Sequence, residues 1–485
     1  MDRPSYSLVT FGCQMNQHDS ERMQEVLSRA GYVQVDDAAV ADVVVLNTCS
    51  VREKAEQKLS SEVGRLGVLK RERPDLLIAV AGCVAQQDGE RLLRRLPQID
   101  LVLGPDNIVE LPALLSELRL GGPPRVRTVF DVDAPSFLRA EPVAGNASVS
   151  AYVTVMKGCD ERCTFCIVPH TRGPERYRPS TEILGEIRRL VEAGTREVVL
   201  LGQTVNSYRD PSRGLPPAVG PDIAWEHTHP STARMDESEF AALLQAIAKG
   251  VPELERLRYV SPHPRHLTAS LIHAHANLNL LARHVHLPVQ SGSNAVLKRM
   301  LRRYSVEEFR ERVNALRDRV PGITLSTDVI VGFPGETPDD FQATLELVGE
   351  IGFVGLFGFK YSPRPFTPAQ RLTDDVPESE KSERLARLFE LSDRLRRRHL
   401  EGLVGTEQRV LVEGRGKNGN YSGRTEQNEI VHFGARGELA GGCETIAIVR
   451  AFKNSLEGKL PDPQRQAPLA SAATQPNKTT LPVVS

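Results

Sequence analysis

The sequence predicts an α/β protein with an N-terminal parallel-sheet domain, a central barrel of β/α units and a small C-terminal antiparallel β-barrel. Short apolar runs alternate with helical patterns over two long stretches, as is typical of parallel sheets. A segment rich in Gly, Pro, Ala and Ser separates these stretches at 121–150. Short alternating runs without helical patterns fill residues 404–460.

At 485 residues the chain is too long for one ordinary core, so we divide it where the pattern changes. The predicted parts are, in chain order, an N-terminal domain at 1–120, a linker at 121–150, a barrel at 151–380, a connecting helix at 381–403, a β-domain at 404–460 and a disordered tail at 461–485.

Charge and composition exclude some functions. Lys and Arg number 61 against 62 Asp and Glu, so any nucleic-acid binding must come from a local patch. The N-terminus has no apolar signal region and no run approaches the length of a membrane span, so we expect a cytoplasmic protein. Thiols stay reduced there, and seven cysteines then indicate metal or redox chemistry before disulfides.

Three cysteines of the N-terminal domain each end a short apolar, β-branched run: Cys13, Cys49 and Cys83. Helical patterns separate these runs, and "IDLVLG" follows as a fourth strand. Ligands of parallel sheets bind at the carboxyl ends of the strands, so we expect the three thiols to converge. The alternative is three unrelated core cysteines, which three equivalent strand ends make less favoured.

A second set of three thiols lies in "KGCDERCTFCIVPH" at 157–170, where Cys159, Cys163 and Cys166 have the spacing C-x3-C-x2-C. Three thiolates can hold a four-iron cluster and leave one iron open to another ligand. A zinc site completed by His170 is the alternative. It is less favoured, because a zinc ribbon would need a second C-x2-C and the sequence has none.

Six strand-like runs separated by helical patterns predict a full or partial TIM barrel with its site at the strands' carboxyl ends. The runs are 152–156, 197–202, 257–261, 284–289, 324–332 and 353–361. Polar residues that follow these strands form a predicted pocket around the second cysteine set: Gln203, Asn206, Ser261, His263, Gln290, Ser291, Asp328 and Glu336.

The C-terminal β-domain carries basic residues that could contact phosphates: Arg415, Lys417, Arg424, Arg450 and Lys453. A solvated face is the alternative, because nearby glutamates nearly balance these charges. The seventh cysteine, Cys443, has no partners in the pattern and is predicted to be a packed thiol.

These motifs resemble those of a known family. The C-x3-C-x2-C spacing after the first strand of six β/α units resembles the radical S-adenosylmethionine (SAM) enzymes. Within them, "FGCQMNQHDSE", "LNTCSVREKAEQK", "AGCVAQ", "LPVQSGS" and "YSPRPFTPA" are similar to the methylthiotransferases, and the resemblance covers about 5–460. By the same resemblance the C-terminal β-domain is a TRAM domain, an RNA-binding module.

The resemblance implies ligands and cofactor contacts. Cys159, Cys163 and Cys166 would hold a 4Fe-4S cluster whose open iron binds SAM, and Cys13, Cys49 and Cys83 would hold a second 4Fe-4S cluster. No catalytic side chain beyond the clusters is implied. The expected cofactor-binding residues are Phe165, which would lie beside the adenine of SAM, and Gln203, Asn206, Ser261, His263, Gln290 and Asp328.

The implied reaction places a methylthio group on C2 of a prenylated adenosine just 3′ of the tRNA anticodon, with two SAM molecules consumed. The wording around the first two cysteines is closest to the tRNA-modifying branch of the family. Expected partners are a tRNA anticodon loop and an electron donor such as a flavodoxin or ferredoxin, and we expect a monomer. Alternatives are modification of a ribosomal-protein aspartate, modification of threonylcarbamoyl-adenosine, and a non-catalytic metal-binding RNA protein.

Three features depart from the family pattern. Phe366 in "RPFTPA" stands where the family usually has glycine. The stretch "TRGPERYRP" also differs from the usual wording. Residues 210–235 read as an inserted loop with the single tryptophan, Trp225, and no function is assigned to them.

Overall fold

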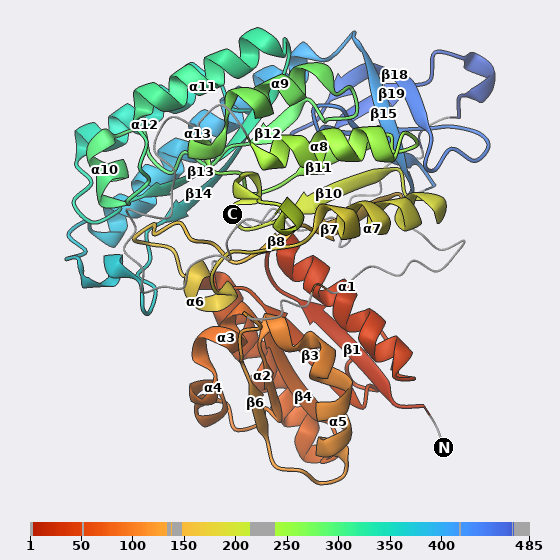
Figure 1. Ribbon diagram of the computed structural model, residues 1–485, viewed down its shortest axis with the longest axis vertical. Helices are drawn as coiled ribbons and strands as arrows, with labels where there is room; N and C mark the ends of the chain where they lie inside the picture. The colour runs from red at the N-terminus through yellow and green to blue at the C-terminus, as the bar shows by residue number, and fades with distance from the viewer. Residues whose placement is uncertain are drawn as a thin grey trace.

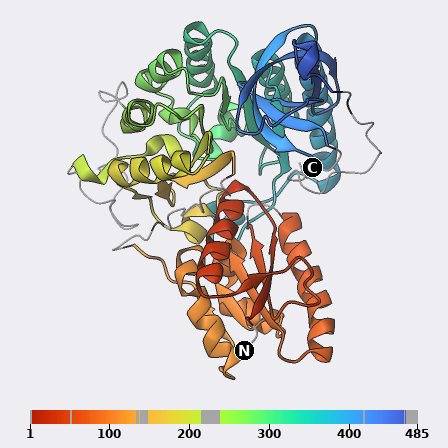
Figure 2. The same cartoon turned by 90° about the vertical axis from the view of Figure 1, so that its right-hand side faces the viewer.

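The computed structural model describes residues 3–50, 53–132, 137, 148–213, 238–416, 419–467 and 469. Trp225 with most of the predicted insertion, Lys417 and most of the predicted tail lie outside the described residues. Figure 1 shows an N-terminal domain at the bottom, a larger β/α domain above it and a small β-barrel at the upper right. The view turned by 90° keeps the N-terminal domain below the other two (Figure 2).

The N-terminal domain is a six-stranded parallel sheet in the order β2-β1-β3-β4-β5-β6. The strands are β1 Ser5–Thr10, β2 Val33–Gln34, β3 Val43–Thr48, β4 Leu77–Gly82, β5 Leu101–Leu103 and β6 Arg125–Arg127. The helices are α1 Gln14–Arg29, α2 Glu53–Glu72, α3 Cys83–Asp88, α4 Glu90–Arg95, η1 Pro105–Glu110 and α5 Leu111–Arg119. β6 belongs to the segment predicted as a linker.

Helices cover both faces of this sheet, which is why its central strands read as continuous apolar runs. Side chains alternate along β3, so Val43 and Val45 pack against α1 and α5, whereas Val44 and Leu46 pack against α2. All six residues of β3 are buried, and so are all six of β4. The carboxyl ends of β1, β3 and β4 therefore lie side by side.

The β/α domain contains six parallel strands, as predicted: β7 Ser150–Thr154, β10 Glu197–Leu201, β11 Arg256–Tyr259, β12 His284–His286, β13 Thr324–Val331 and β14 Gly355–Lys360. They form two three-stranded sheets, β11-β10-β7 and β12-β13-β14, linked where Leu257 bridges Leu281 just before β12. A short hairpin of β8 Met156–Lys157 and β9 Arg176–Tyr177 lies beside the first strand.

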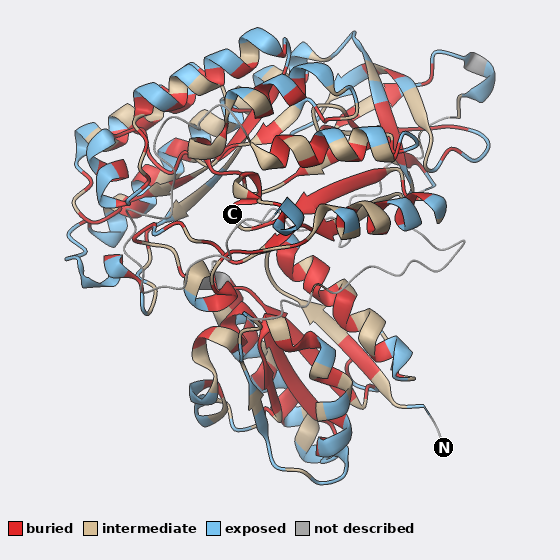
Figure 3. Ribbon diagram, viewed as in Figure 1, coloured by how far each residue is buried: buried red, intermediate tan, exposed pale blue. Residues whose placement is uncertain are grey.

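Amphipathic helices wrap these strands around one large apolar core. They are α7 Ser180–Glu192, α8 Glu239–Gly250, α9 Ala269–Asn277, α11 Val306–Arg319, α12 Pro338–Ile351 and α13 Glu378–Gly402. Shorter helices follow strand ends: α6 Val168–Arg172, η2 Val205–Ser207, η3 Pro211–Arg213, η6 Pro264–His266, α10 Asn294–Arg299 and η7 Pro368–Arg371. Figure 3 shows buried strands beneath helices whose outer sides are exposed.

The C-terminal domain is a closed barrel in the order β15-β16-β17-β19-β18. Its strands are β15 Glu407–Arg415, β16 Tyr421–Thr425, β17 Ile430–Phe433, β18 Cys443–Ala451 and β19 Leu456–Lys459, and the short helix η8 Pro463–Arg465 follows them. Arg256 and Arg258 of β11 donate hydrogen bonds to its backbone, at Arg424 O (2.8 Å) and Thr425 O (3.1 Å). The predicted three-part architecture is confirmed.

Within the described part of the chain, the structure contains no helix long and apolar enough to span a bilayer.

Candidate active site

The first cysteine set meets at the carboxyl ends of β1, β3 and β4. Register pairs Thr10 with Asn47 and Thr48 with Gly82, which brings the residues just beyond the strand ends together. The thiols of Cys13 and Cys49 are hydrogen-bonded, and this contact lowers the pKa of Cys13 to about 6. Cys83 begins α3, and burial raises the pKa of its thiol. The three thiols converge where the topology predicted.

Glycine precedes three of the six thiols for a steric reason. Gly12, Gly82 and Gly158 all have positive φ. A Cβ on Gly12 would lie 2.5 Å from the Cβ of Cys49, and one on Gly158 would lie 1.9 Å from the Pro174 carbonyl oxygen. Each Gly-Cys step therefore requires glycine to turn the chain tightly and present the thiol.

The second cysteine set lies in the loop between β8 and α6. Cys159 Sγ is 3.0 Å from Thr204 Oγ1, and Arg302 Nη1 donates to Cys163 Sγ at 3.4 Å. The Cys166 N–H donates to the Cys163 carbonyl, so the loop folds back on itself. Burial raises the pKa of Cys166 to about 12 and that of Cys159 well above its usual value. Iron binding must therefore displace protons from these thiols.

The spacing of the thiols fits a cluster better than a single ion. A tetrahedral zinc ion with bonds of about 2.3 Å needs sulfurs about 3.8 Å apart. Among the described residues, the group of three potential ligand atoms within 4.8 Å of one another comprises Glu161, His263 and His266, and includes neither cysteine set. In each set at least one pair of thiols is therefore farther apart than 4.8 Å, and three thiolates suit a four-iron cluster with one open iron, so these residues fit the implied group.

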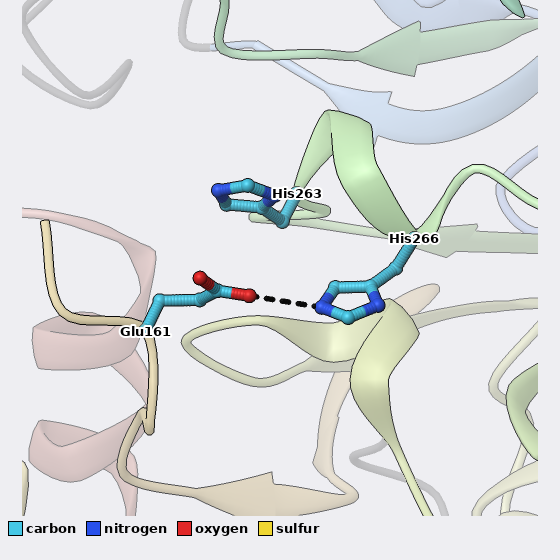
Figure 4. A group of neighbouring side chains, drawn as sticks. All are labelled: Glu161, His263 and His266. Atoms are coloured by element: carbon cyan, nitrogen blue, oxygen red, sulfur yellow. Dashed lines mark hydrogen bonds and ion pairs between the residues drawn. The ribbon is translucent and has the colours of Figure 1, made fainter. Parts of the chain in front are cut away.

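Glu161, His263 and His266 form a buried clamp on the loop between Cys159 and Cys163. Figure 4 shows the Glu161 carboxylate meeting His266, with the His263 ring beside it, and the carboxylate oxygen lies 3.0 Å from His266 Nε2. Burial opposes ionisation, but the His266 hydrogen bond and the charges of nearby cations hold the pKa of Glu161 well below its usual range. Arg265 lies 4.0 Å from the same carboxylate. The hydrogen bond with His266 and the nearby charge of Arg265 hold the carboxylate in place, so the group fixes the loop.

Two predicted SAM contacts end in buried atoms without partners. In the described residues, the side-chain amide of Gln203 and Nε2 of His263 are buried and have no hydrogen-bond partner. Such groups are costly unless a ligand satisfies them. Asn206 behaves differently, because its amide exchanges two hydrogen bonds, of 2.8 and 3.0 Å, with the backbone of His263. Asn206 therefore positions His263.

The other predicted contacts also lie around the cluster loop. Ser261 and Gln290 have φ of 58° and 73°, strained values for residues other than glycine, at the carboxyl ends of β11 and β12. Asp328 lies on β13 and its carboxylate is 3.3 Å from His286 Nε2. Phe165 packs against an apolar group that includes Met300 and Tyr361. Gln203, Asn206, Ser261, His263 and Gln290 follow the carboxyl ends of β10, β11 and β12, and Phe165 lies in the cluster loop, whereas Asp328 lies within β13.

Sequence reasoning missed the residues that join the two domains carrying the cysteine sets. Arg172, at the end of α6, donates Nε to Cys83 Sγ (3.3 Å) and Nη2 to Asp19 Oδ2 (2.6 Å), and it is 5% exposed. Its unusual neighbourhood, "TRGPERYRP", was the available signal. Asp106 of the N-terminal domain similarly pairs with Lys157 (3.2 Å) and Arg176 of the β8–β9 hairpin.

Apolar packing seals the same interface. Met15 of α1 packs against Val199 and Leu201 of β10, with Cys13 at the edge of the group. His18 lies 3.4 Å from Thr154, and burial lowers its pKa well below the usual value, so it meets the barrel uncharged. Apolar and charge-paired contacts therefore join the cysteine-bearing end of the N-terminal sheet to the β/α domain.

Three family models match the chain in turn. Residues 5–104 match "Uncharacterized protein family UPF0004", residues 153–348 match "Radical SAM superfamily" and residues 402–460 match "TRAM domain". The matched regions correspond to the parallel-sheet domain, the β/α barrel and the closed C-terminal barrel.

Relatives with assigned activities match over nearly the whole length. The chain is 60% identical to a tRNA-2-methylthio-N(6)-dimethylallyladenosine synthase of Sorangium cellulosum, with 99% of each chain covered. It is 43% identical to a protein of the same name from Acidithiobacillus ferrooxidans, over 93% of this chain and 96% of the relative.

A solved structure supports the fold. A radical SAM methyltransferase from Kitasatospora setae, determined with cobalamin and a [4Fe-4S] cluster bound, aligns with a TM-score of 0.52 at 15% identity and covers 76% of this chain and 77% of its own.

Proposed function

The chain belongs to the tRNA-2-methylthio-N(6)-dimethylallyladenosine synthase family of radical SAM enzymes, and we propose that it carries out that reaction on tRNA. The enzyme transfers a methylthio group to C2 of N6-dimethylallyladenosine on the 3′ side of the anticodon. Its cofactors are SAM and 4Fe-4S clusters, as in other radical SAM enzymes. The C2–H bond of adenine has no useful acidity, so radical chemistry suits this reaction where acid–base chemistry does not.

The observation that carries the proposal is a buried, ion-paired interface that joins the two domains carrying the cysteine sets. Arg172 donates a hydrogen bond to Cys83 of the first set and lies only six positions after Cys166 of the second set. An enzyme that must activate a C–H bond at one centre and deliver sulfur from another needs both centres at the same substrate. The structure of this chain supports that arrangement.

We assign the barrel set to SAM chemistry. Cys159, Cys163 and Cys166 would hold the cluster that, with SAM bound, supplies the radical. Phe165, Gln203 and His263 would contact SAM, because the latter two present unsatisfied buried atoms in the described structure. Asn206 holds the His263 backbone, and Glu161 holds the cluster loop in place.

We assign the N-terminal set to sulfur transfer. Cys13, Cys49 and Cys83 would hold the second cluster, the sulfur-carrying centre. Arg172 and Asp19 would hold Cys83 in place at the domain interface, and Met15 with its apolar neighbours would exclude water. A protein of the flavodoxin or ferredoxin class would supply electrons to a monomeric enzyme.

The C-terminal barrel would bind tRNA through exposed cations. Arg450, paired at 2.6 Å with Glu457, and Lys453, paired at 3.0 Å with Asp393, lie in exposed ion pairs. Exposed pairs contribute little, so phosphates can displace their carboxylates. The target base sits in a single-stranded loop and can be turned out into the barrel.

The test is anaerobic reconstitution followed by reaction with two tRNA preparations, one prenylated and one not. Nucleosides digested from the prenylated tRNA should carry the methylthio group, while the unprenylated tRNA stays unmodified. Equal modification of both, or modification of a ribosomal protein instead, would contradict the proposal. Zinc as the sole bound metal would favour a non-catalytic RNA-binding protein.

A further inference from the structure

Phe366 is an exposed aromatic residue held in a strained backbone conformation. Its side chain is 53% exposed, more than Phe357 at 38% or Phe452 at 43%. Its φ is +68°, in the left-handed region that a bulky side chain rarely adopts. Residues held in such conformations cluster at functional sites, where the strain is tolerated because the position does a task.

The loop that carries Phe366 is anchored on the site. It follows β14, the last strand of the barrel, on the side where the strands' carboxyl ends lie. The Ala369 N–H donates to the carbonyl of Thr164 in the cluster loop at 2.9 Å, and Tyr361 Oη donates to Ala369 O at 2.9 Å. Arg364 pairs with Glu56 of the N-terminal domain at 3.7 Å. The Phe366 ring is therefore fixed beside both domains.

Two side chains flank the ring. The Arg91 guanidinium of α4 lies 5.2 Å from the ring centroid, and the His170 ring of α6 lies at 5.7 Å with a tilt of 41°. Arg91 is 52% exposed, and His170 is exposed as well. Burial and the charge of Arg162 lower the pKa of His170, which keeps it neutral and able to stack at pH 7. We call Arg91, His170 and Phe366 the aromatic platform.

We propose that the aromatic platform stacks one unpaired nucleobase of the anticodon loop next to the target adenosine, and that Arg91 contacts the adjoining phosphate. This inference rests on the proposed function. Exposed aromatic rings beside arginine are how proteins grip single-stranded nucleic acid, since every base has a face that stacks. The platform lies against the cluster loop, where the bases flanking a turned-out adenosine must pass.

The rival explanation is a latch, in which the contact between Arg91 and Phe366 merely joins the domains. The two explanations differ in the side chain they require. Stacking needs an aromatic ring at position 366, so it tolerates tyrosine. A latch that joins the domains would instead be revealed by a lower melting temperature when the contact is removed. Glycine adopts positive φ without strain, so Phe366→Gly should melt no lower than the unchanged chain if the ring has no structural task.

The experiment measures binding of a prenylated anticodon stem-loop to reconstituted Phe366→Leu, Phe366→Tyr and Phe366→Gly. Loss of one stacked base should weaken binding roughly tenfold in the Leu and Gly variants, and Tyr should stay within about twofold. Leu372→Ala, which removes another exposed apolar side chain from the same loop, is the matched control and should bind normally. Iron content and melting temperature are measured in parallel.

Salt dependence separates the two contacts. The affinity ratio between Phe366→Leu and the unchanged chain should not vary with salt, whereas Arg91→Gln should reduce the slope of log K against log salt by about one. A stem-loop with 2-aminopurine beside the target adenosine should lose fluorescence on binding, but not with Phe366→Leu.

Two results would overturn the platform while leaving the proposed function intact. One is normal binding by Phe366→Leu in an enzyme that modifies prenylated tRNA. The other is an equal loss of stem-loop affinity in the Leu and Tyr variants together with a lower melting temperature, which would mean that the ring acts as a latch between the domains. Failure of the unchanged chain to modify prenylated tRNA would instead refute the proposed function.

Discussion

Arg172 of the β/α domain contacts the first cysteine set through residues that lie far away in the chain. Its partners Cys83 and Asp19 are 89 and 153 positions away. A buried ion pair of this kind costs desolvation and is retained only with good geometry, so it specifies how the domains meet more than it stabilises them. The six cysteines could be proposed as ligands from the sequence because each lies in a local motif. Arg172 was not, because local patterns carry no information about distant partners.

The two cysteine sets should lose their metal independently. Replacing Cys159, Cys163 and Cys166 with Ala should abolish SAM cleavage and leave about half of the iron, since the other set lies in a separate domain. Replacing Cys13, Cys49 and Cys83 should keep SAM cleavage but stop methylthiolation. Iron and sulfide counting with a SAM-cleavage assay checks both variants. A folded triple variant without any iron would disprove the two-site assignment.

Glu175 should make stability fall as pH rises. Burial raises the pKa of Glu175 to about 7 from 4.5, although hydrogen bonds from Tyr177 and Ser207 oppose the shift. The folded chain therefore keeps this proton between about pH 4.5 and 7 while the unfolded chain releases it. The stability that this proton contributes is complete below pH 4.5 and is lost as pH rises through 7. The free energy of unfolding should fall by about 3 kcal/mol over this range.

The matched variant is Glu175→Gln, which cannot titrate. Melting temperatures of the metal-free proteins are measured at pH 5 and pH 8. The variant should melt close to the unchanged chain at pH 5 and at a clearly higher temperature than the unchanged chain at pH 8. A difference that does not change with pH would mean that Glu175 is already ionised in the fold.

At the scale of secondary-structure elements, the cysteines of both sets follow the carboxyl ends of strands. Long apolar strands such as β3 and β4 were predictable because burial on both faces leaves a continuous run. The edge strands β2 and β6 were missed, since two or three residues with a single valine among polar or charged side chains carry no such signal. The sequence predicted that polar residues follow the barrel strands. Which of these side chains have hydrogen-bond partners and which have none depends on tertiary contacts that the sequence does not show.

The turn before Cys159 should depend on glycine. Gly158→Ala places a Cβ 1.9 Å from the Pro174 carbonyl oxygen at a φ of +78°, so the cluster loop must shift. We expect loss of iron from this set and a stability loss of at least about 2 kcal/mol. Gly185→Ala is the control, because the nearest atom would be 3.6 Å away inside α7, and it should gain up to about 1 kcal/mol. Iron content and melting temperature distinguish them; equal behaviour of the two variants would refute the steric argument.

At the scale of the whole molecule, the C-terminal barrel is anchored to the core and is not a loosely tethered module. Arg396 and His399 of α13 contact Glu429, and Arg409 of β15 pairs with Glu255 at 2.7 Å. Deleting residues 404–485 should raise the tRNA concentration needed for reaction more than it disturbs SAM cleavage. It also strips partners from Arg256 and Arg258, so some loss of core stability should accompany it.

A double variant tests tRNA binding and loses, of the contacts with α13, only the exposed pair of Lys453 with Asp393. Arg450→Ser with Lys453→Ser removes two cations that lie away from the contacts with β11 and Glu429. Each lost phosphate contact should reduce the slope of log K against log salt by about one. The slope of the double variant should therefore be smaller by about two, and the variant should bind tRNA more weakly at low salt. Arg119→Gln, an exposed charge at the far end of α5, is the control and should change neither quantity. An unchanged slope in the double variant would place the phosphate contacts elsewhere on the chain.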